Sequence, residues 1–191
     1  MLIGSHNSMS YLKPTKWYLN PFRFMARCQR KTLEEQYENY NARMFDFRVK
    51  FDGTTPKFRH GLMEYDADVY EYLKYLNSKK DTVVRIILED TKESLTQELL
   101  FIKFCSKIKK KYKGIKFIGG IRKGDWKTLY SFGNEVTYLD KYSSNNKEKS
   151  PVTGTILDDL WPWLYAKFNN KKNIKLGTTK DYLLIDFVDI Q

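Results

Sequence analysis

The chain has 191 residues, 41% of them hydrophobic and 16% aromatic, which excludes a disordered chain and predicts a single domain over residues 1–191. No apolar run approaches the roughly 20 residues of a membrane-spanning helix. No basic flank or cleavage site precedes the first strand, so we expect no signal peptide and a cytoplasmic protein, with release by another route as the alternative. Two cysteines and two histidines are too few for a disulfide framework, a zinc site or a histidine-rich metal centre.

The net charge of +11 favours an anionic partner, namely a membrane surface, nucleic acid or a phosphorylated substrate. A lysine-rich, solvated surface explains the same charge equally well. The densest basic run, residues 107–116, falls at a predicted helix end, where cations also complement the helix dipole.

The predicted elements begin with a short strand at Leu2 that runs through Gly4 into His6. Residues 9–27 form an aromatic loop, either a lid or membrane-contacting rim or, as we rather expect, a cover folded back over one end of the core. Capping and apolar periodicity predict helices over residues 32–40, 68–77, 95–112 and 157–168 and a helical turn over 126–130. Strands are predicted over residues 42–51, 57–59, 82–88, 115–118, 136–139 and 182–188, and an exposed loop over 143–150.

The pattern also makes specific predictions about a strand end, a proline in a helix and the buried face of another helix. Gly119-Gly120 closes the strand over residues 115–118, and Pro162 must fall near the first turn of its helix or kink it. The buried side of the helix over residues 95–112 is marked by Leu95, Leu99, Phe101, Ile102, Cys105 and Ile108.

The strand over residues 42–51 carries two different faces. Phe45 and Phe47 point one way with Val49, while Asp46 and Arg48 point the other way with Met44. Paired charges on an inward face usually mark a site.

Strands alternate with helices along most of the chain, which predicts an α/β fold with a parallel sheet. Polar residues cluster where the strands end: His6, His60, Glu89, Asp140 and Asp186. These ends meet on one face of a (β/α) barrel, so we predict a compact, distorted TIM-like (β/α) barrel with parallel strands and outer helices. A doubly wound sheet is the alternative, although it has no need of an inward Asp/Arg pair in mid-strand.

Two histidines at strand ends can divide acid and base work at neutral pH, and a guanidinium between them would stabilise charge on a phosphoryl oxygen. This combination suits metal-free phosphodiester cleavage. Separate structural hydrogen bonds for His6 and His60, with a plain Asp46–Arg48 ion pair, are the alternative. Both histidines of the chain lie at strand ends, and this coincidence with the Asp46–Arg48 pair makes the structural alternative weaker.

The stretches Gly4-Ser5-His6-Asn7-Ser8, Arg43-x-Phe45-Asp46-x-Arg48 and His60-Gly61 resemble the catalytic X region of bacterial phosphatidylinositol-specific phospholipase C. The segment from Val136 to Tyr142 resembles the strand end that contacts inositol in this family, and that from Leu184 to Val188 resembles its final strand.

The resemblance implies a distorted (β/α) barrel and an internal attack of the inositol 2-hydroxyl on phosphorus. His6 would be the general base, oriented by Asp186, and His60 the general acid for the diacylglycerol oxygen. Arg48 would clamp the phosphate, with Asp46 holding His60 or Arg48. The first product would be a cyclic inositol phosphate. Asp140 and Tyr142 would contact the inositol ring, and Arg122 is a weaker candidate for the same role.

Two residues depart from the bacterial pattern. Asn7 stands where the bacterial enzymes carry aspartate, and Glu89 stands where they tend to carry lysine. Both resemble the calcium-dependent eukaryotic form, in which Asn7, Asp46 and Glu89 would supply oxygen ligands. Arg48 instead occupies the position of a carboxylate of that form, so we expect no metal and no other cofactor, with calcium as the alternative. A Glu89–Arg48 ion pair is the structural interpretation of Glu89.

Two further functions remain open. One is glycerophosphodiester- or sphingomyelin-type hydrolysis, which usually needs a metal held by several carboxylates. The other is a non-catalytic basic protein that binds lipid or nucleic acid, with binding that falls steeply with salt. The resemblance favours a monomer with a phosphoinositide or other phosphodiester lipid as substrate and peripheral contact with an anionic membrane surface, and makes nucleic acid an unexpected partner.

Overall fold

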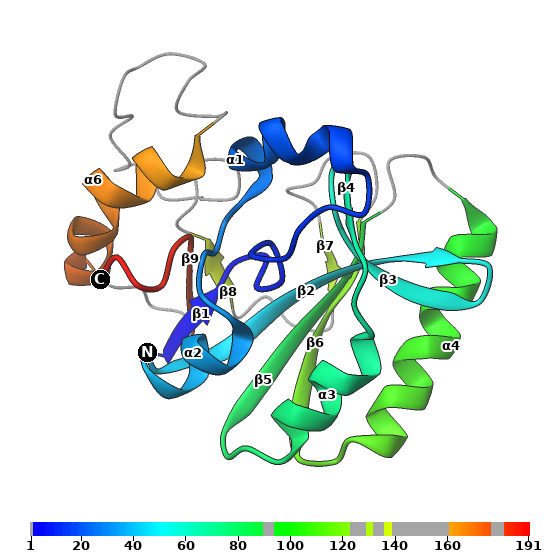
Figure 1. The fold of residues 1–191 in the computed structure, drawn as a ribbon. Coiled ribbons are helices and arrows are strands. Elements are labelled where there is room, and N and C mark those ends of the chain that lie inside the picture. Colours follow the sequence, from blue (N-terminus) through cyan, green and yellow to red (C-terminus); the bar gives the residue numbers. More distant parts are fainter. Residues whose placement is uncertain (1, 90–93, 123–128, 132–135, 139–160, 177–181) are drawn as a thin grey trace.

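Nine strands form a single mixed sheet in the computed structural model, which describes residues 2–89, 94–122, 129–131, 136–138, 161–176 and 182–191 (Figure 1). The strands are β1 (Leu2–Ser5), β2 (Ala42–Asp52), β3 (Thr55–His60), β4 (Met63–Tyr65), β5 (Thr82–Leu88), β6 (Ile115–Arg122), β7 (Leu129–Ser131), β8 (Val136–Tyr138) and β9 (Tyr182–Ile185). The helices are η1 (Trp17–Phe22), α1 (Arg23–Ala26), α2 (Leu33–Glu38), α3 (Val69–Asn77), α4 (Leu95–Lys111) and α6 (Pro162–Leu176).

The strand order is β7-β6-β5-β2-β1-β9-β8, with β3 and β4 continuing from β2 as a hairpin. Strands β1, β2, β5, β6, β8 and β9 pair with one another in parallel. Strand β3 runs antiparallel to β2, and β7 runs antiparallel to β6. The α/β class is therefore confirmed. The closed, all-parallel barrel is not: within the ranges that the structure describes, β7 and β8 are the two edges of an open sheet.

The antiparallel hairpin has a consequence for the site. Because β3 runs back along β2, with Phe58 opposite Val49, it returns His60 to the middle of β2 rather than to its carboxyl end. The 57–59 strand was predicted correctly, but its direction is opposite to that of a barrel strand.

Strand β2 divides the apolar residues of the protein into two clusters, as its alternation predicts. Phe45, Phe47 and Val49 belong to the large core beneath α2, α3 and α4. Met44 faces the other way, into a small cluster with Val83, Ile118, Tyr182 and Leu184. The charged residues of β2 lie beyond this small cluster, on its side of the strand.

The glycines near the centre of the sheet permit close approach. A Cβ on Gly4 would come within 2.6 Å of the Met44 side chain. Gly119 has φ +117° and a Cβ there would meet the Ile86 carbonyl oxygen at 1.9 Å. Gly119 and Gly120 lie inside β6 rather than closing it, because this close approach lets the strand continue to Arg122.

Most helix predictions are confirmed in outline. Thr32 and Glu35 form the expected capping box on α2, Asp68 caps α3, and Pro162 is the first residue of α6. The expected burial of α4 is partly wrong, because Leu95, Leu99 and Ile102 are exposed. Residues 129–130 of the expected helical turn lie in β7, and residues 126–128, 139, 143–150 and 157–160 of the predicted elements lie outside the described ranges.

The aromatic loop before α2 covers the core only in part: Met9 is buried in the large core, and Tyr11, Leu12 and Leu19 pack against it. It contains η1 and α1, and Trp17, Tyr18, Phe22 and Phe24 are all exposed, with 81% of Trp17 accessible. None of the helices in the described ranges combines the length and apolar composition that crossing a bilayer requires.

Candidate active site

The side chains of His6 and Asp186 meet at the ends of two adjacent parallel strands. Ser5 of β1 pairs with Ile185 of β9, so the next residue of each strand emerges at the same edge. His6 Nδ1 lies 2.7 Å from Asp186 Oδ1, and both residues are buried. Gln29 fixes this junction, since its Nε2 donates to the carbonyl oxygens of His6 and Ile185.

Asp46 is the most enclosed carboxylate of the site. Its Oδ2 accepts from Arg48 Nε and from the Asn7 backbone N–H, both at 3.0 Å, while its Oδ1 accepts from Arg85 Nη1. Burial acts to raise the pKa of Asp46, but Arg85, Arg48 and His6 outweigh it and hold that pKa well below its usual value. The carboxylate therefore stays ionised, and the expected Asp46–Arg48 pair is confirmed as a contact.

Arg48 lies between the two histidines. Its Nη2 is 2.5 Å from His6 Nε2, and its Nη1 is 3.5 Å from both His60 Nδ1 and Glu89 Oε2. Because a guanidinium only donates, His6 Nε2 is the acceptor and Nδ1 carries the proton that faces Asp186. This is the tautomer that a general base requires, with Nε2 free of a proton.

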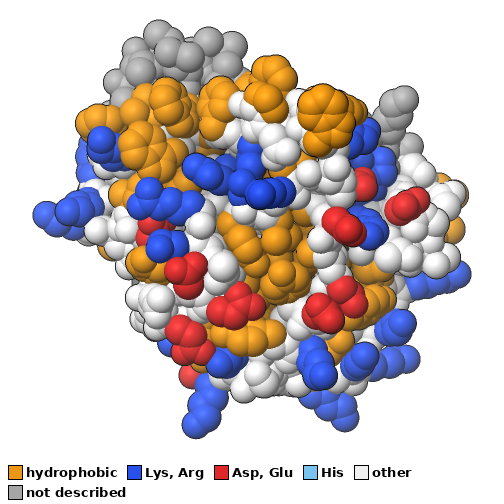
Figure 2. Space-filling view, viewed as in Figure 1, with side chains coloured by type: hydrophobic (Ala, Val, Ile, Leu, Met, Phe, Trp, Pro, Cys, Tyr) orange, Lys and Arg blue, Asp and Glu red, His pale blue; other side chains and the backbone are white. Residues whose placement is uncertain are grey.

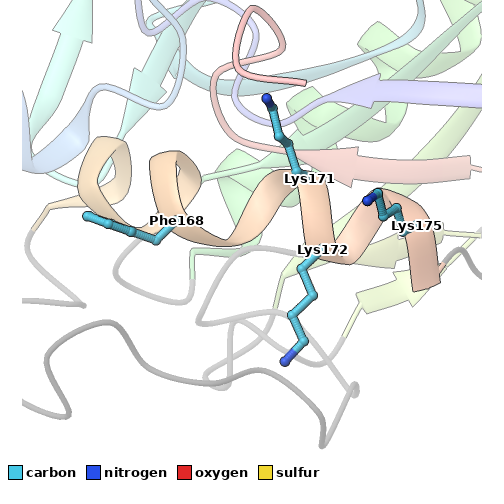
Figure 3. A pocket seen from close by; sticks show the side chains of 4 residues that line it. All are labelled: Phe168, Lys171, Lys172 and Lys175. Carbon is cyan, nitrogen blue, oxygen red and sulfur yellow. The ribbon is translucent and has the colours of Figure 1, made fainter.

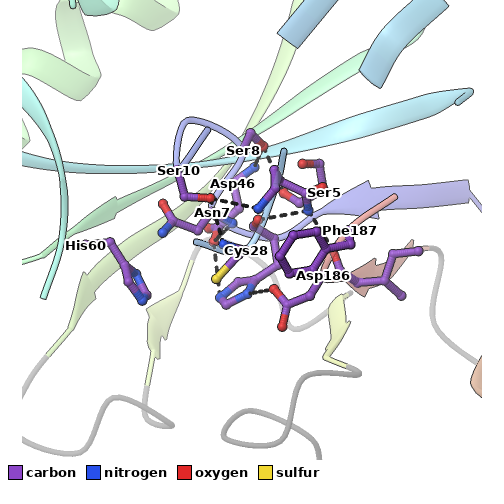
Figure 4. Close-up of polar contacts among 12 residues, drawn as sticks. Ser5, Asn7, Ser8, Ser10, Cys28, Asp46, His60, Asp186 and Phe187 are labelled. Atoms are coloured by element: carbon purple, nitrogen blue, oxygen red, sulfur yellow. Dashed lines mark hydrogen bonds and ion pairs between the residues drawn. The ribbon is translucent and has the colours of Figure 1, made fainter. Parts of the chain in front are cut away.

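The ring of His60 lies 6.2 Å from that of His6, centroid to centroid, at an interplanar angle of 87°. Burial and the Arg48 charge lower the pKa of His60 to about 3, although Glu89 acts in the opposite direction. His60 is therefore neutral at physiological pH in the protein without substrate. Figure 4 shows His60 and Asp186 reaching the same region from different strands.

Glu89 links the histidine hairpin to β5. Its Oε1 accepts from the Gly61 N–H at 3.2 Å, and its Oε2 faces Arg48. Gly61 has φ +56°, which a glycine adopts readily in the tight turn after His60. The Glu89–Arg48 ion pair expected from the sequence is thus present.

The remaining predicted site residues are Asn7, Arg122, Asp140 and Tyr142. Asn7 is buried at φ 42°, and its Nδ2 has no hydrogen-bond partner among the described residues. Arg122 is the last residue of β6, and its side chain is not described. Asp140 and Tyr142 lie outside the described ranges.

Two sets of side chains have metal-binding character. In the calcium set, both oxygens of Asp46 already accept from arginines, and both oxygens of Glu89 face N–H donors. In the second set, His6, Cys28 and Asp186 offer ligand atoms within 4.8 Å of one another. The acceptor role of His6 Nε2 places a proton on Nδ1, so the second set fits a hydrogen-bonded His–Asp pair better than a metal.

The sequence did not single out Arg85 or the amides and hydroxyls that support the site. Arg85 interrupts the apolar run Val83–Leu88, and a charge in such a run must find a partner, which was the available signal. Gln36 of α2 bonds Ser5 and Ser8, and Ser8 Oγ accepts from the Asp46 N–H. No comparable signal marks Gln29 or Gln36, because each acts through contacts distant in the chain.

The exposed aromatic side chains form a band that we call the aromatic edge. It consists of Trp17, Tyr18, Phe22, Phe24, Trp161 and Phe168. The rings of Phe24 and Trp161 lie 6.0 Å apart and join α1 to the start of α6, and Figure 2 shows hydrophobic side chains gathered where η1, α1 and α6 meet the surface. Thr15 donates to Glu64 of β4 at 2.8 Å, so η1 starts beside the hairpin that carries His60.

An open groove adjoins this edge on α6. Phe168, Lys171, Lys172 and Lys175 line it, and Figure 3 shows the three lysines projecting from the helix. None of the predicted site residues lines this groove, so it is a basic surface feature separate from the histidines.

The fold is similar to that of a known enzyme class. The phosphatidylinositol-specific phospholipase C from Listeria monocytogenes superposes with a TM-score of 0.58, covering 97% of this chain and 87% of that chain at 16% sequence identity. No family model matches the sequence, and no curated protein matches it. At this identity the likeness establishes the fold.

Proposed function

We propose that this protein is a phosphodiesterase that cleaves phosphatidylinositol-type phosphodiesters. The observation that carries the proposal is the single guanidinium, Arg48, held between His6 and His60 with an ionised Asp46 behind it. The similarity of fold to a phospholipase C supports the same class of reaction and a distorted, open form of the (β/α) barrel.

In the proposed reaction His6 Nε2 takes the proton of the inositol 2-hydroxyl, whose oxygen attacks phosphorus. Asp186 orients the ring of His6 and stabilises the positive charge that develops there. The bond from phosphorus to the diacylglycerol oxygen breaks, and His60 supplies a proton to that oxygen. The products are diacylglycerol and a cyclic inositol phosphate, and the internal attack gains from the proximity of the two groups.

Arg48 has two roles in this scheme. Without substrate it donates to His6 Nε2, and with substrate its terminal N–H groups donate to the phosphate oxygens instead, which releases Nε2 for the hydroxyl. The buried Nδ2 of Asn7, unpartnered among the described residues, supplies a further donor for the substrate. Arg122, Asp140 and Tyr142 are proposed to contact the inositol ring, by resemblance.

The role of His60 depends on the substrate. Its pKa of about 3 without ligand leaves it unprotonated at neutral pH. A phosphodiester anion neutralises the Arg48 charge that contributes to this low value, so substrate binding raises the pKa of His60 toward the range of a general acid. We therefore propose that His60 becomes an acid only in the substrate complex.

The proposed reaction uses no metal. The guanidinium groups at Asp46 supply the positive charge that a cation would bring to the phosphate. The aromatic edge and the adjoining lysines of α6 are proposed to contact an anionic membrane surface, because exposed aromatic rings and cations suit the headgroup region of a bilayer.

The test is an assay of phosphatidylinositol vesicles with and without a chelator, using wild type, His6→Ala and His60→Ala. We expect cyclic inositol phosphate in the presence of chelator, and a loss of about 10²- to 10⁴-fold in each variant with the fold retained. Activity only with calcium would overturn the metal-free reaction. Salt-sensitive vesicle binding without any turnover would instead favour a non-catalytic lipid-binding protein.

A further inference from the structure

Arg85 is a buried charge in the middle of the sheet. It occupies the fourth position of β5, directly opposite Asp46 of β2 in the parallel register, and only 2% of it is exposed. Val83, two residues earlier on the same face of β5, belongs to the small apolar cluster. An arginine at such a depth is expensive to bury, so its contact with Asp46 needs an explanation beyond packing.

The charges around Arg48 supply that explanation. Three cationic or titratable groups face Asp46: Arg48 on the same strand, Arg85 on β5 and His6 at the end of β1. Glu89 and His60 face Arg48, and Asp186 faces His6 from the end of β9. Three buried carboxylates, Asp46, Glu89 and Asp186, thus surround the place where a phosphodiester anion is proposed to bind, and Arg48 alone would leave this place poor in positive charge.

The two arginines bind different oxygens of the Asp46 carboxylate. Arg85 takes Oδ1 of Asp46, which leaves Oδ2 for Arg48 Nε and the Asn7 N–H. With both oxygens held, the carboxylate cannot rotate, and the Nε contact fixes the plane of the Arg48 guanidinium. Its two terminal nitrogens then point at His6 and His60.

We propose that Arg85 is a positioning residue that locks Asp46 in one orientation and one charge state, and thereby aims Arg48 at the phosphate of the substrate. This inference rests on the proposed phosphodiesterase function. Arg85 acts through Asp46 and needs no contact with substrate, in contrast to Arg48.

The test compares Arg85→Met, which removes the charge at similar volume, with Arg85→Lys, which keeps it. Arg43→Met is the matched control, because Arg43 lies on β2 but stacks on Tyr37 with 4.2 Å between the guanidinium carbon and the ring centroid. Activity on phosphatidylinositol vesicles is measured between about pH 5 and pH 8. The titration of the Asp46 carboxyl and of the His6 ring is followed by NMR in the same variants.

For Arg85→Met we expect kcat/KM to fall about 100-fold at the acid end of this range and less at the alkaline end. The physical reason is that Asp46 then protonates more readily and releases Arg48. Arg85→Lys keeps the acid limb of the wild type, and Arg43→Met changes neither limb. A uniform loss at every pH, or an unchanged profile in a folded Arg85→Met protein, overturns the inference.

The titration separates this inference from the proposed function. If the wild type does not cleave phosphatidylinositol, the proposed function fails, whereas a raised Asp46 pKa and an altered His6 titration in Arg85→Met still support the role of Arg85. An Asp46 pKa that does not rise overturns that role whatever the activity. Should Arg85→Met not fold, Arg85→Gln takes its place with the same two outcomes.

Discussion

The charged centre around Arg48 and the aromatic edge differ in how their residues are held. In the centre, a single residue such as Asp46 accepts hydrogen bonds from two side chains and one backbone N–H, and its neighbours are buried. On the edge, Trp17 and Phe168 are more than half exposed. A change in the centre must therefore propagate through a network, whereas a change to an exposed ring of the edge leaves that network intact.

The largest effect that distinguishes the two regions should come from Arg48→Lys. An ammonium cannot reach Asp46, His6 and His60 together, so the phosphate loses its paired donors. We expect kcat to fall about 10²- to 10³-fold on vesicles and on a soluble, short-chain substrate alike.

The control for this change is Arg43→Lys, which alters an arginine outside the centre. Equal activities of the two variants would mean that Arg48 does not stabilise the reacting phosphate.

An intermediate effect, restricted to membranes, is expected from Trp17→Ala combined with Phe22→Ala. These side chains are 81% and 55% exposed and contribute little to the core. Loss of two apolar anchors should weaken vesicle binding by at least about tenfold, because a buried aromatic side chain is worth about 1.5–3 kcal/mol. Sedimentation with anionic vesicles measures the binding, and activity on a soluble substrate should stay unchanged.

The pair Leu95→Ala and Leu99→Ala offers a matched control for the edge, since these side chains are exposed on α4. If this pair weakens vesicle binding as much as the edge pair does, general surface hydrophobicity explains the binding and the edge has no special role.

The smallest effect concerns stability and pH. The folded pKa of His60, about 3, lies below the ordinary value of 6.5, so the folded state disfavours its protonated form. The stability that neutral His60 supplies is therefore complete above about pH 6.5 and is lost as the pH falls toward 3. Urea unfolding should show a free energy of unfolding that falls by up to about 1.4 kcal/mol per pH unit through this window.

In His60→Gln this part of the slope should disappear. Asp46 adds a second loss only at lower pH, below its ordinary value of 3.8, because its folded pKa is depressed. An identical slope between pH 6.5 and pH 4 in wild type and His60→Gln would contradict the assignment of a low pKa to His60.

The sequence predicted the residues of the centre better than the path of the sheet. Local signals were sufficient for β2, because its alternation separates Phe45 and Phe47 from Asp46 and Arg48, and for α2, because its capping box is a four-residue pattern. The direction of β3 and the open edges at β7 and β8 depend on pairing between distant strands, which local periodicity does not encode.

The site shows the same division. The pairing of His6 with Asp186 was predicted from the family resemblance, and the Arg48–Glu89 contact was predicted as the structural role of Glu89. The exposure of Trp17 agrees with the rim alternative and not with the preferred cover, because an aromatic residue in a loop gives the same sequence pattern in both cases. Arg85 was overlooked because the β-branched run around it dominated the pattern.

The pairing of β1 with β9 also sets an order of events in time. Asp186 follows His6 by 180 positions in the chain, so His6 is synthesised well before its partner. During synthesis the histidine has no carboxylate to orient it until the ribosome has released the segment that forms β9. The proposed centre is therefore incomplete on the nascent chain until β9 has paired with β1.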